Sequence, residues 1–276
     1  MTERLQHGEV EGMRVGRFPL RYNTTCILYR LGSTVIDTGP PNQWRAVRTF
    51  LAERAVRQVV VTHHHEDHSG NLAPIGRTFD APLFAPRSGL GPLGSGLRLR
   101  PYQHLFWGRP EPVAAQALPR KVPLDGGRAL EAIPAPGHSA DMTCFFDRQR
   151  GWLFSGDLYI AGRTRLLRQD EDLGSAMASL RRILGYDFAT LFCAHRGVVS
   201  DGKAALRRKL DFLESLCQRV AALHGQGRSR PEITRLLLGR EGFMTFLTGF
   251  HFSKRNLVVG CLAALPEAGA ASSTLL

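Results

Sequence analysis

Histidine and acidic side chains crowd one short segment that directly follows an apolar run. Val59-Val60-Val61 leads into Thr62, and residues 63–68 read His-His-His-Glu-Asp-His. A β-branched run predicts a buried strand, so the polar segment must leave the sheet as a loop at the strand's carboxyl edge. Open α/β sheets carry their ligand sites at that edge.

Imidazole and carboxylate are ligand types that hold Zn, Fe or Mn. Ligands one residue apart in a tight loop can converge on one small volume, so the spacing H-x-H-x-D-H predicts a metal site. A solvated histidine-rich loop or an expression tag is the alternative, and the interleaved acids and the flanking apolar strand weigh against it. The ligand types do not choose among the three metals.

Four more short motifs stand along the chain. Asp37 lies in Val-Ile-Asp-Thr-Gly, His138 in Pro-Gly-His-Ser, Asp157 in Ser-Gly-Asp and His195 in Cys-Ala-His-Arg-Gly. With the histidine segment they make the chain resemble the metallo-β-lactamase superfamily, which follows H-x-H-x-D-H with a third histidine, a bridging aspartate and a last histidine. Asp157 resembles the bridging aspartate of glyoxalase II-like hydrolases, lactonases and phosphodiesterases more than the zinc β-lactamases proper. Arg196 is a departure, because the family often has glycine beside its last histidine.

The resemblance implies an α/β fold, the four-layer αββα metallo-β-lactamase sandwich, with a C-terminal helical appendage. A chain of 276 residues is long enough for one such domain. We therefore expect residues 1–200 to form the metallo-β-lactamase-fold domain and residues 201–276 to form helices packed on the same domain.

The resemblance also assigns ligands for two divalent metal ions. The first ion would be bound by the three imidazoles of His63, His65 and His138. The second would be bound by Asp67, His68 and His195, with Asp157 bridging the two ions. Two cations close together need a shared anion to limit their repulsion, and a carboxylate plus a hydroxide, the implied nucleophile, supply it. Zinc is the favoured metal, with iron and manganese as alternatives.

Further roles concern the neighbours of these ligands. Asp67 and Asp157 are assigned to catalysis together with Tyr159, a candidate oxyanion donor. Asp37 is expected to accept a hydrogen bond from the far nitrogen of a ligand histidine, or else only to form the turn at a strand end. His64 and Glu66 occupy the variable positions of the motif and are expected to point away from the metals.

The charge of the chain favours an anionic small-molecule substrate. The formal net charge is +12, and only four of the basic residues are lysines. The planar fork of arginine suits carboxylate or phosphate recognition, although genomic base composition can also produce arginine in place of lysine.

The segment from Pro86 to Pro123 is rich in proline, glycine, bases and aromatics and shows little regular patterning. A long irregular segment in a compact enzyme is usually functional, so we predict that it covers the substrate, a surface insertion being the alternative. Arg98 and Arg100 within it, and Arg196, are candidate contacts to an anionic substrate. Bases interleaved with aromatics also suit single-stranded nucleic acid.

Hydrophobic periodicity predicts the remaining elements. We expect strands joined near residues 31–33, a helix over about 43–54, strands at 129–135, 142–146 and 152–155, and helices over 172–184 and 203–224. Ser229 and Glu232 resemble a capping box that opens a further helix.

The compartment expected from the sequence is the cytoplasm, without a membrane partner. Residues 1–10 lack the apolar core of a signal peptide, and no apolar run is long enough to span a bilayer. The five cysteines show no C-x-x-C spacing, so buried reduced thiols are expected rather than a disulfide framework.

These observations predict a metal-dependent hydrolase that cleaves an ester or thioester of an anionic small molecule, in the manner of glyoxalase II. Three alternatives stay open: a phosphodiesterase or nucleic-acid hydrolase, a mononuclear iron thiol dioxygenase, and a regulatory or binding protein that retains the metal site with low turnover. The motifs choose neither the substrate nor the oligomeric state.

Overall fold

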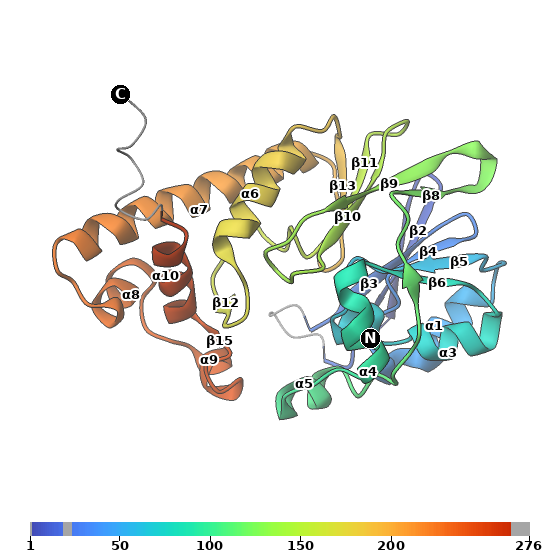
Figure 1. Cartoon of the computed structure of the whole chain (residues 1–276), viewed down its shortest axis with the longest axis horizontal. Helices are drawn as coiled ribbons and strands as arrows, with labels where there is room; N and C mark the ends of the chain where they lie inside the picture. Colours follow the sequence, from blue (N-terminus) through green and yellow to red (C-terminus); the bar gives the residue numbers. More distant parts are fainter. Residues whose placement is uncertain (1, 19–23, 266–276) are drawn as a thin grey trace, which may run out of the picture.

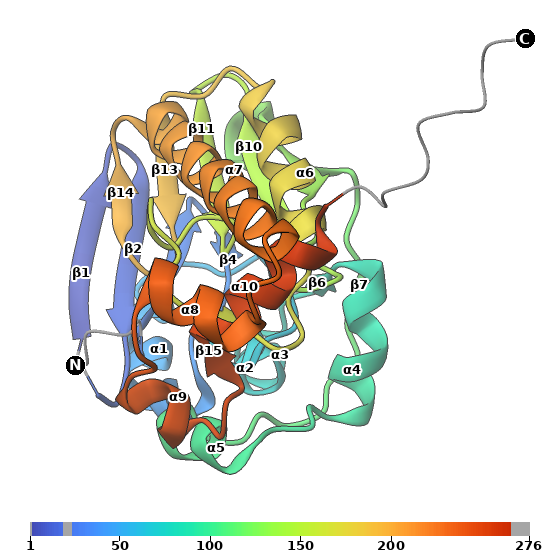
Figure 2. The ribbon, with the colours of Figure 1, turned by 90° about the vertical axis from the view of Figure 1, so that its left-hand side faces the viewer.

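The computed structural model describes residues 2–18 and 24–265, so the expectations for residues 1, 19–23 and 266–276 lie outside the described part. Two β-sheets lie at its centre, with helices on both sides (Figures 1 and 2). A third, two-stranded sheet joins β12 (Leu167–Arg168) to β15 (Phe252–Ser253).

The first sheet has seven strands in chain order, with antiparallel pairs up to β4 and parallel pairs from β4 to β7. Its strands are β1 (Thr2–His7), β2 (Val10–Val15), β3 (Cys26–Leu31), β4 (Thr34–Ile36), β5 (Gln58–Val60), β6 (Leu83–Ala85) and β7 (Gln116–Ala117). The second sheet has six strands in the order β14-β13-β11-β10-β9-β8. These are β8 (Lys121–Pro123), β9 (Ala129–Pro134), β10 (Thr143–Asp147), β11 (Trp152–Gly156), β13 (Thr190–Cys193) and β14 (Gly197–Val199).

The helices follow the same chain order. They are α1 (Trp44–Leu51), α2 (Glu66–Ser69), α3 (Leu72–Phe79), α4 (Leu90–Ser95), α5 (Pro101–Phe106), α6 (Leu173–Leu184), α7 (Gly202–Gly225), α8 (Arg230–Leu238), α9 (Phe243–Leu247) and α10 (Lys254–Ala263). Three 3-10 turns complete the set at Pro41–Gln43, Arg87–Gly89 and Asp125–Gly127. No helix within the described ranges is long and apolar enough to cross a bilayer.

Strand alternation sorts the core into three layers of side chains. Ile27 and Tyr29 of β3 face the second sheet and join a cluster with Phe145 and Phe154, whereas Leu28 faces α1 and α3. The same period of two recurs in the second sheet, where Phe145 faces inward while its neighbours face α6 and α7. The two inner faces and the two helical layers give the four-layer αββα sandwich that the sequence predicts.

The helices after residue 201 share the core of the second sheet. Leu206, Leu210 and Leu213 of α7 lie in one buried cluster with α6 and with strand residues of that sheet. The helix α7 begins and ends within one residue of the predicted range, and Ser229 and Glu232 form the expected capping box at the start of α8.

Two segments contain more regular structure than the sequence predicts. Residues 2–7 form the edge strand β1, paired along its whole length with β2. The segment from Pro86 to Pro123 contains α4, α5, a 3-10 turn and short strands, so about half of it is regular. Its many glycines and prolines hid these elements, because both residue types lower helix propensity.

The loop that carries His138 is pressed against α6. Gly137 has a φ of +142°, and a Cβ at this position would overlap the Cα and Cβ of Ala176. We expect Gly137→Ala to lower the free energy of unfolding by roughly 2–4 kcal/mol, the sum of backbone strain and overpacking.

Gly126 provides the control for this prediction. It also has a positive φ, but a Cβ there would meet open space. Gly126→Ala should therefore cost only about 1 kcal/mol of backbone strain. Urea unfolding of both variants measures the difference, and equal losses would show that the contact with Ala176 does not matter.

Candidate metal centre

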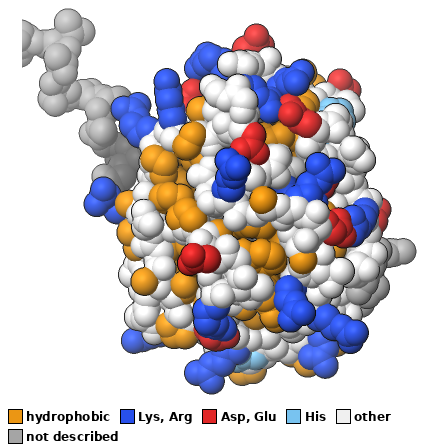
Figure 3. Space-filling model, turned by 90° about the vertical axis from the view of Figure 1, so that its right-hand side faces the viewer, with side chains coloured by type: hydrophobic (Ala, Val, Ile, Leu, Met, Phe, Trp, Pro, Cys, Tyr) orange, Lys and Arg blue, Asp and Glu red, His pale blue; other side chains and the backbone are white. Residues whose placement is uncertain are grey.

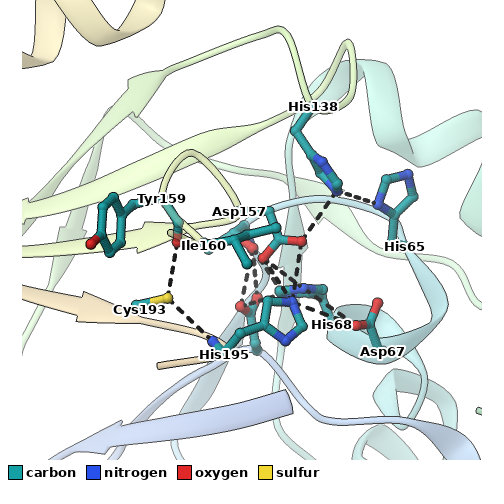
Figure 4. Close-up of polar contacts among 12 residues, drawn as sticks. His65, Asp67, His68, His138, Asp157, Tyr159, Ile160, Cys193 and His195 are labelled. Carbon is teal, nitrogen blue, oxygen red and sulfur yellow. Dashed lines mark hydrogen bonds and ion pairs between the residues drawn. The ribbon is translucent and has the colours of Figure 1, made fainter. Parts of the chain in front are cut away.

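The side chains of the expected metal site lie at the carboxyl ends of four strands. His63 and His65 follow β5, with Asp67 and His68 on the adjoining α2. His138 follows β9, Asp157 follows β11 and His195 follows β13. These last three strands run in the same direction, because β10 is antiparallel to β9 and β11 while β13 is parallel to β11. Their ends therefore meet at one edge of the sandwich (Figure 4).

Three imidazoles form the first ligand cluster. His63 Nε2 lies 2.8 Å from His65 Nδ1, which lies 3.0 Å from His138 Nε2. Burial lowers the pKa of His63 and of His65 well below the usual value, so both rings are neutral. One N–H cannot satisfy three converging nitrogens, whereas one cation accepts a lone pair from each. The donor set fits a metal ion.

The second cluster gathers around Asp157. Its Oδ1 lies 3.1 Å from His195 Nε2 and 3.3 Å from His68 Nε2, and Asp67 Oδ2 lies 3.8 Å from each of these nitrogens. Asp157 Oδ2 lies 3.2 Å from His138 Nε2, so the carboxylate faces both clusters. Within the described residues, His68 Nε2 and Asp157 Oδ1 are buried without a hydrogen-bond partner, as expected for atoms that bind a metal.

Electrostatics favour positive charge at this second cluster. Burial opposes protonation of His68, yet Cys26 and the carboxylates of Asp157 and Asp67 raise its pKa overall. Burial would raise the pKa of Asp157, but His195, His68 and His138 lower it well below the usual range. The Cys26 thiol also lies near Asp67 and His68, a neighbour that the sequence did not reveal.

Outer contacts hold three of the ligand rings in place. His68 Nδ1 lies 2.8 Å from Asp37 Oδ2, and the other oxygen of Asp37 accepts the N–H of Thr62 at 2.8 Å. His195 Nδ1 donates to the carbonyl of Thr25 at 2.7 Å, and His138 Nδ1 lies 3.3 Å from Glu171 Oε1. Each contact places the ring proton on Nδ1 and leaves Nε2 free as a ligand atom. Asp37 thus lies where the sequence predicts, whereas no motif pointed to Glu171.

A cavity of about 620 Å³ opens beside these clusters. Its wall includes the aromatics Tyr102, Phe106 and Trp107, which belong to the segment predicted to cover the substrate. Its cationic lining consists of Arg163, Arg165, Arg168, Arg196 and Lys209. Figure 3, by contrast, shows basic side chains scattered among apolar and acidic ones over an outer face.

Several predicted site residues lie elsewhere. Arg98 and Arg100 are exposed and are not part of the cavity wall. Tyr159 points away from the clusters (Figure 4) and packs against the buried residues of the second sheet. The reason is a turn after β11, closed by the bond from Leu158 N–H to Ser155, which breaks the strand period that would bring residue 159 to the side of Asp157.

The two variable positions of the histidine motif behave differently. His64 turns away from the cavity and bonds to Asp141 through its backbone N–H and its ring, both at 2.8 Å. Glu66 belongs to neither ligand cluster, but its buried side chain lines the cavity and accepts a hydrogen bond from Gln103 at 2.7 Å. Burial, the largest cause, raises the pKa of Glu66. The start of α2 at Glu66 turns this residue inward.

The sequence model of the Metallo-beta-lactamase superfamily matches residues 19–195, which contain all seven expected ligands. The chain belongs to this superfamily. The atrochrysone carboxyl ACP thioesterase of Pseudocercospora fijiensis is 27% identical over 225 residues, covering 76% of this chain and 60% of that protein. The lactamase-like protein aptB of Emericella nidulans is 28% identical over 223 residues, covering 76% of this chain and 65% of that protein. The chain thus matches less than two thirds of the length of these relatives.

Solved structures share the fold of this superfamily member. A beta-lactamase domain protein from Burkholderia ambifaria superposes with a TM-score of 0.69 at 18% identity, covering 95% of this chain and 88% of that one. A metallo-beta-lactamase family protein from Thermus thermophilus gives a TM-score of 0.65 at 18% identity, covering 94% and 92%. Both likenesses include the C-terminal helical part.

The outer contact of Asp37 generates a prediction. We expect Asp37→Asn to weaken zinc affinity about 10- to 100-fold, because the amide no longer holds His68 in its tautomer with a charged acceptor. Competition with a chromophoric chelator measures the affinity, and circular dichroism checks the fold. Asp141→Asn is the control, since Asp141 is a buried carboxylate that bonds to His64 instead of a ligand. Equal affinities of Asp37→Asn and the wild type would remove the assigned role of Asp37.

Proposed function

We propose that this protein is a dinuclear metal-dependent hydrolase that cleaves thioesters, with zinc as the favoured metal. One observation carries the proposal: the buried carboxylate of Asp157 faces two separate ligand clusters beside a cavity of about 620 Å³. Metal ions held there by His63, His65 and His138, and by Asp67, His68 and His195, would activate water and polarise the substrate carbonyl.

The protein's own side chains would bind and orient the substrate. The cationic lining suits an anionic acyl compound, and the aromatics on α5 and at Trp107 supply an apolar wall. Asp67 lines the cavity. Its carboxylate would orient water and accept a proton from it.

The pKa of the leaving group favours thioesters over amides as substrates. Tyr159 points away from the clusters (Figure 4) and does not line the cavity, so we do not assign it as the proton donor to a leaving atom. A thiol has a pKa near 8.5, so a thiolate departs without a dedicated acid, unlike an amine. Relatives named as carboxyl ACP thioesterases support the same reaction class. The substrate of this chain is proposed only as an acyl thioester.

Metal stoichiometry tests the dinuclear part of the proposal. Metal-saturated protein should contain two ions per chain, and Asp157→Ala should reduce this to one or fewer, because both clusters lose a shared anion. His64→Ala is the matched control from the same loop, since His64 bonds to Asp141 away from the cavity. Elemental analysis by mass spectrometry reports the content, and a wild-type value near one would contradict the dinuclear assignment.

A substrate panel tests the reaction class. We expect the kcat/KM for an N-acetylcysteamine thioester to exceed that for a chromogenic β-lactam by at least ~100-fold, about 2.7 kcal/mol of transition-state stabilisation. The assays run side by side with Zn, Mn and Fe. Efficient cleavage of bis(p-nitrophenyl) phosphate with no thioester hydrolysis would establish the phosphodiesterase alternative instead.

A further inference from the structure

We propose that Arg168 forms a carboxylate-binding subsite beside the metal centre, and that this subsite selects acyl groups bearing a second, anionic group. The inference rests on the proposed thioester hydrolysis and adds a substrate class to it. None of the motifs in the sequence pointed to this residue.

Arg168 is a buried cation in the wall of the cavity. It lies on β12, and its side chain is 10% exposed. The guanidinium carbon stands 6.0 Å from the ring centre of Phe252, on the paired strand β15. The short sheet formed by these strands therefore brings an arginine to the metal centre from outside both large sheets.

One edge of the guanidinium is fixed by a carboxylate. Arg168 Nε donates to Asp170 Oδ1 at 2.9 Å and Nη2 donates to Asp170 Oδ2 at 2.6 Å. Such a two-pronged pair sets the plane of the group as well as its position. The Asp170 side chain is 57% exposed, so the pair runs from the surface inward.

The other edge is turned toward the metal ligands. Arg168 Nη1 lies 3.3 Å from His65 Nδ1, the atom through which His65 joins the first cluster. A guanidinium carries donors and no acceptor. When the lone pair of His65 Nδ1 binds a metal ion, it no longer accepts from Nη1, and this edge is left to an acceptor that arrives at the same place. A carboxylate oxygen of a bound substrate meets that requirement.

Asp170 is itself held by a second pair of side chains. His251 Nε2 lies 3.4 Å from Asp170 Oδ1, and His251 Nδ1 lies 2.6 Å from the hydroxyl of Tyr102. Burial would raise the pKa of Asp170, but the hydrogen bonds from His251 and Arg168 lower it, so it remains a carboxylate. Three distant stretches of chain thus converge to orient one arginine, which reduces the cost of ordering it when a ligand binds.

The positive charge of Arg168 beside the metal ligands should favour anionic acyl groups over neutral ones. Arginine stays protonated, and a cation beside ligands that gather metal ions is repelled by those ions. An anionic group placed between them is attracted by both. A neutral acyl group leaves this repulsion in place, so the site should discriminate by charge more than by size.

Two thioesters of N-acetylcysteamine that differ mainly in charge test the proposal. Wild-type enzyme should show a lower KM for the succinyl thioester than for the pentanoyl thioester. In Arg168→Gln the succinyl KM should rise about 10- to 100-fold while the pentanoyl KM and kcat stay within about threefold, the pattern of lost ground-state binding. Arg168→Lys should lie between them, because it keeps the charge and loses the fork.

Arg207→Gln is the matched control for net charge. Arg207 lies exposed on α7 and does not line the cavity, so both KM values should match the wild type. Equal losses for both thioesters in Arg168→Gln would overturn the subsite and assign Arg168 to the reacting centre or to folding. Unchanged KM values would also overturn it.

A binding measurement separates this inference from the proposed reaction. Calorimetric titration with succinate should show binding to the wild type and to Arg207→Gln, and at least about tenfold weaker binding to Arg168→Gln. If neither thioester is hydrolysed, the proposed function fails while the titration still decides the subsite. If the wild type hydrolyses both thioesters but shows no preference and no succinate binding, the subsite fails and thioester hydrolysis stands.

Discussion

The burial of Asp157 among imidazoles is the constraint on which the site depends. A carboxylate removed from water costs several kcal/mol unless cations and hydrogen bonds compensate it. Oδ1 of Asp157 has no hydrogen-bond partner in the described residues, and its nearest groups are the Nε2 atoms of His68 and His195. Positive charge must therefore reside at this point, either as protons on the rings or as metal ions.

The hydrogen bonds at the Nδ1 atoms of the histidines indicate that the fold favours metal ions over ring protons as the source of this charge. His68, His138 and His195 each have a carboxylate or carbonyl acceptor at Nδ1, so their Nε2 lone pairs face the carboxylate of Asp157. Lone pairs and a carboxylate repel one another unless a cation stands between them. Asp37 and Thr25 flank strands of the first sheet, and Glu171 lies just before α6, which packs on the second sheet. A bound metal would therefore couple the two halves of the sandwich.

The sequence predicted the ligands and the layers better than the walls of the cavity. Short motifs at strand ends were enough to locate the ligands, since parallel strands bring their carboxyl ends together. The strands joined near residues 31–33 and the strand at 142–146 were also expected, and the structure shows which of their side chains face the inner core. The same motif-based inference failed for Tyr159, because a turn after β11 changes the direction of its side chain. The position of Arg168 in the cavity wall could not be predicted either. It depends on the pairing of β12 with β15, which lies far along the chain and leaves no local sequence pattern.

The residues expected to bind metal and the residues that line the rest of the cavity differ in their relation to the family match. The ligand side chains lie within the stretch that matches the family, residues 19–195. The cavity wall also uses Lys209, Met244 and Phe252, which lie beyond that stretch, and Arg168, which no family motif marks. The expected metal ligands and part of the cavity wall therefore come from different stretches of the chain. The proposed substrate class therefore rests on the cavity of this chain, which places an oriented arginine beside the expected metal ligands.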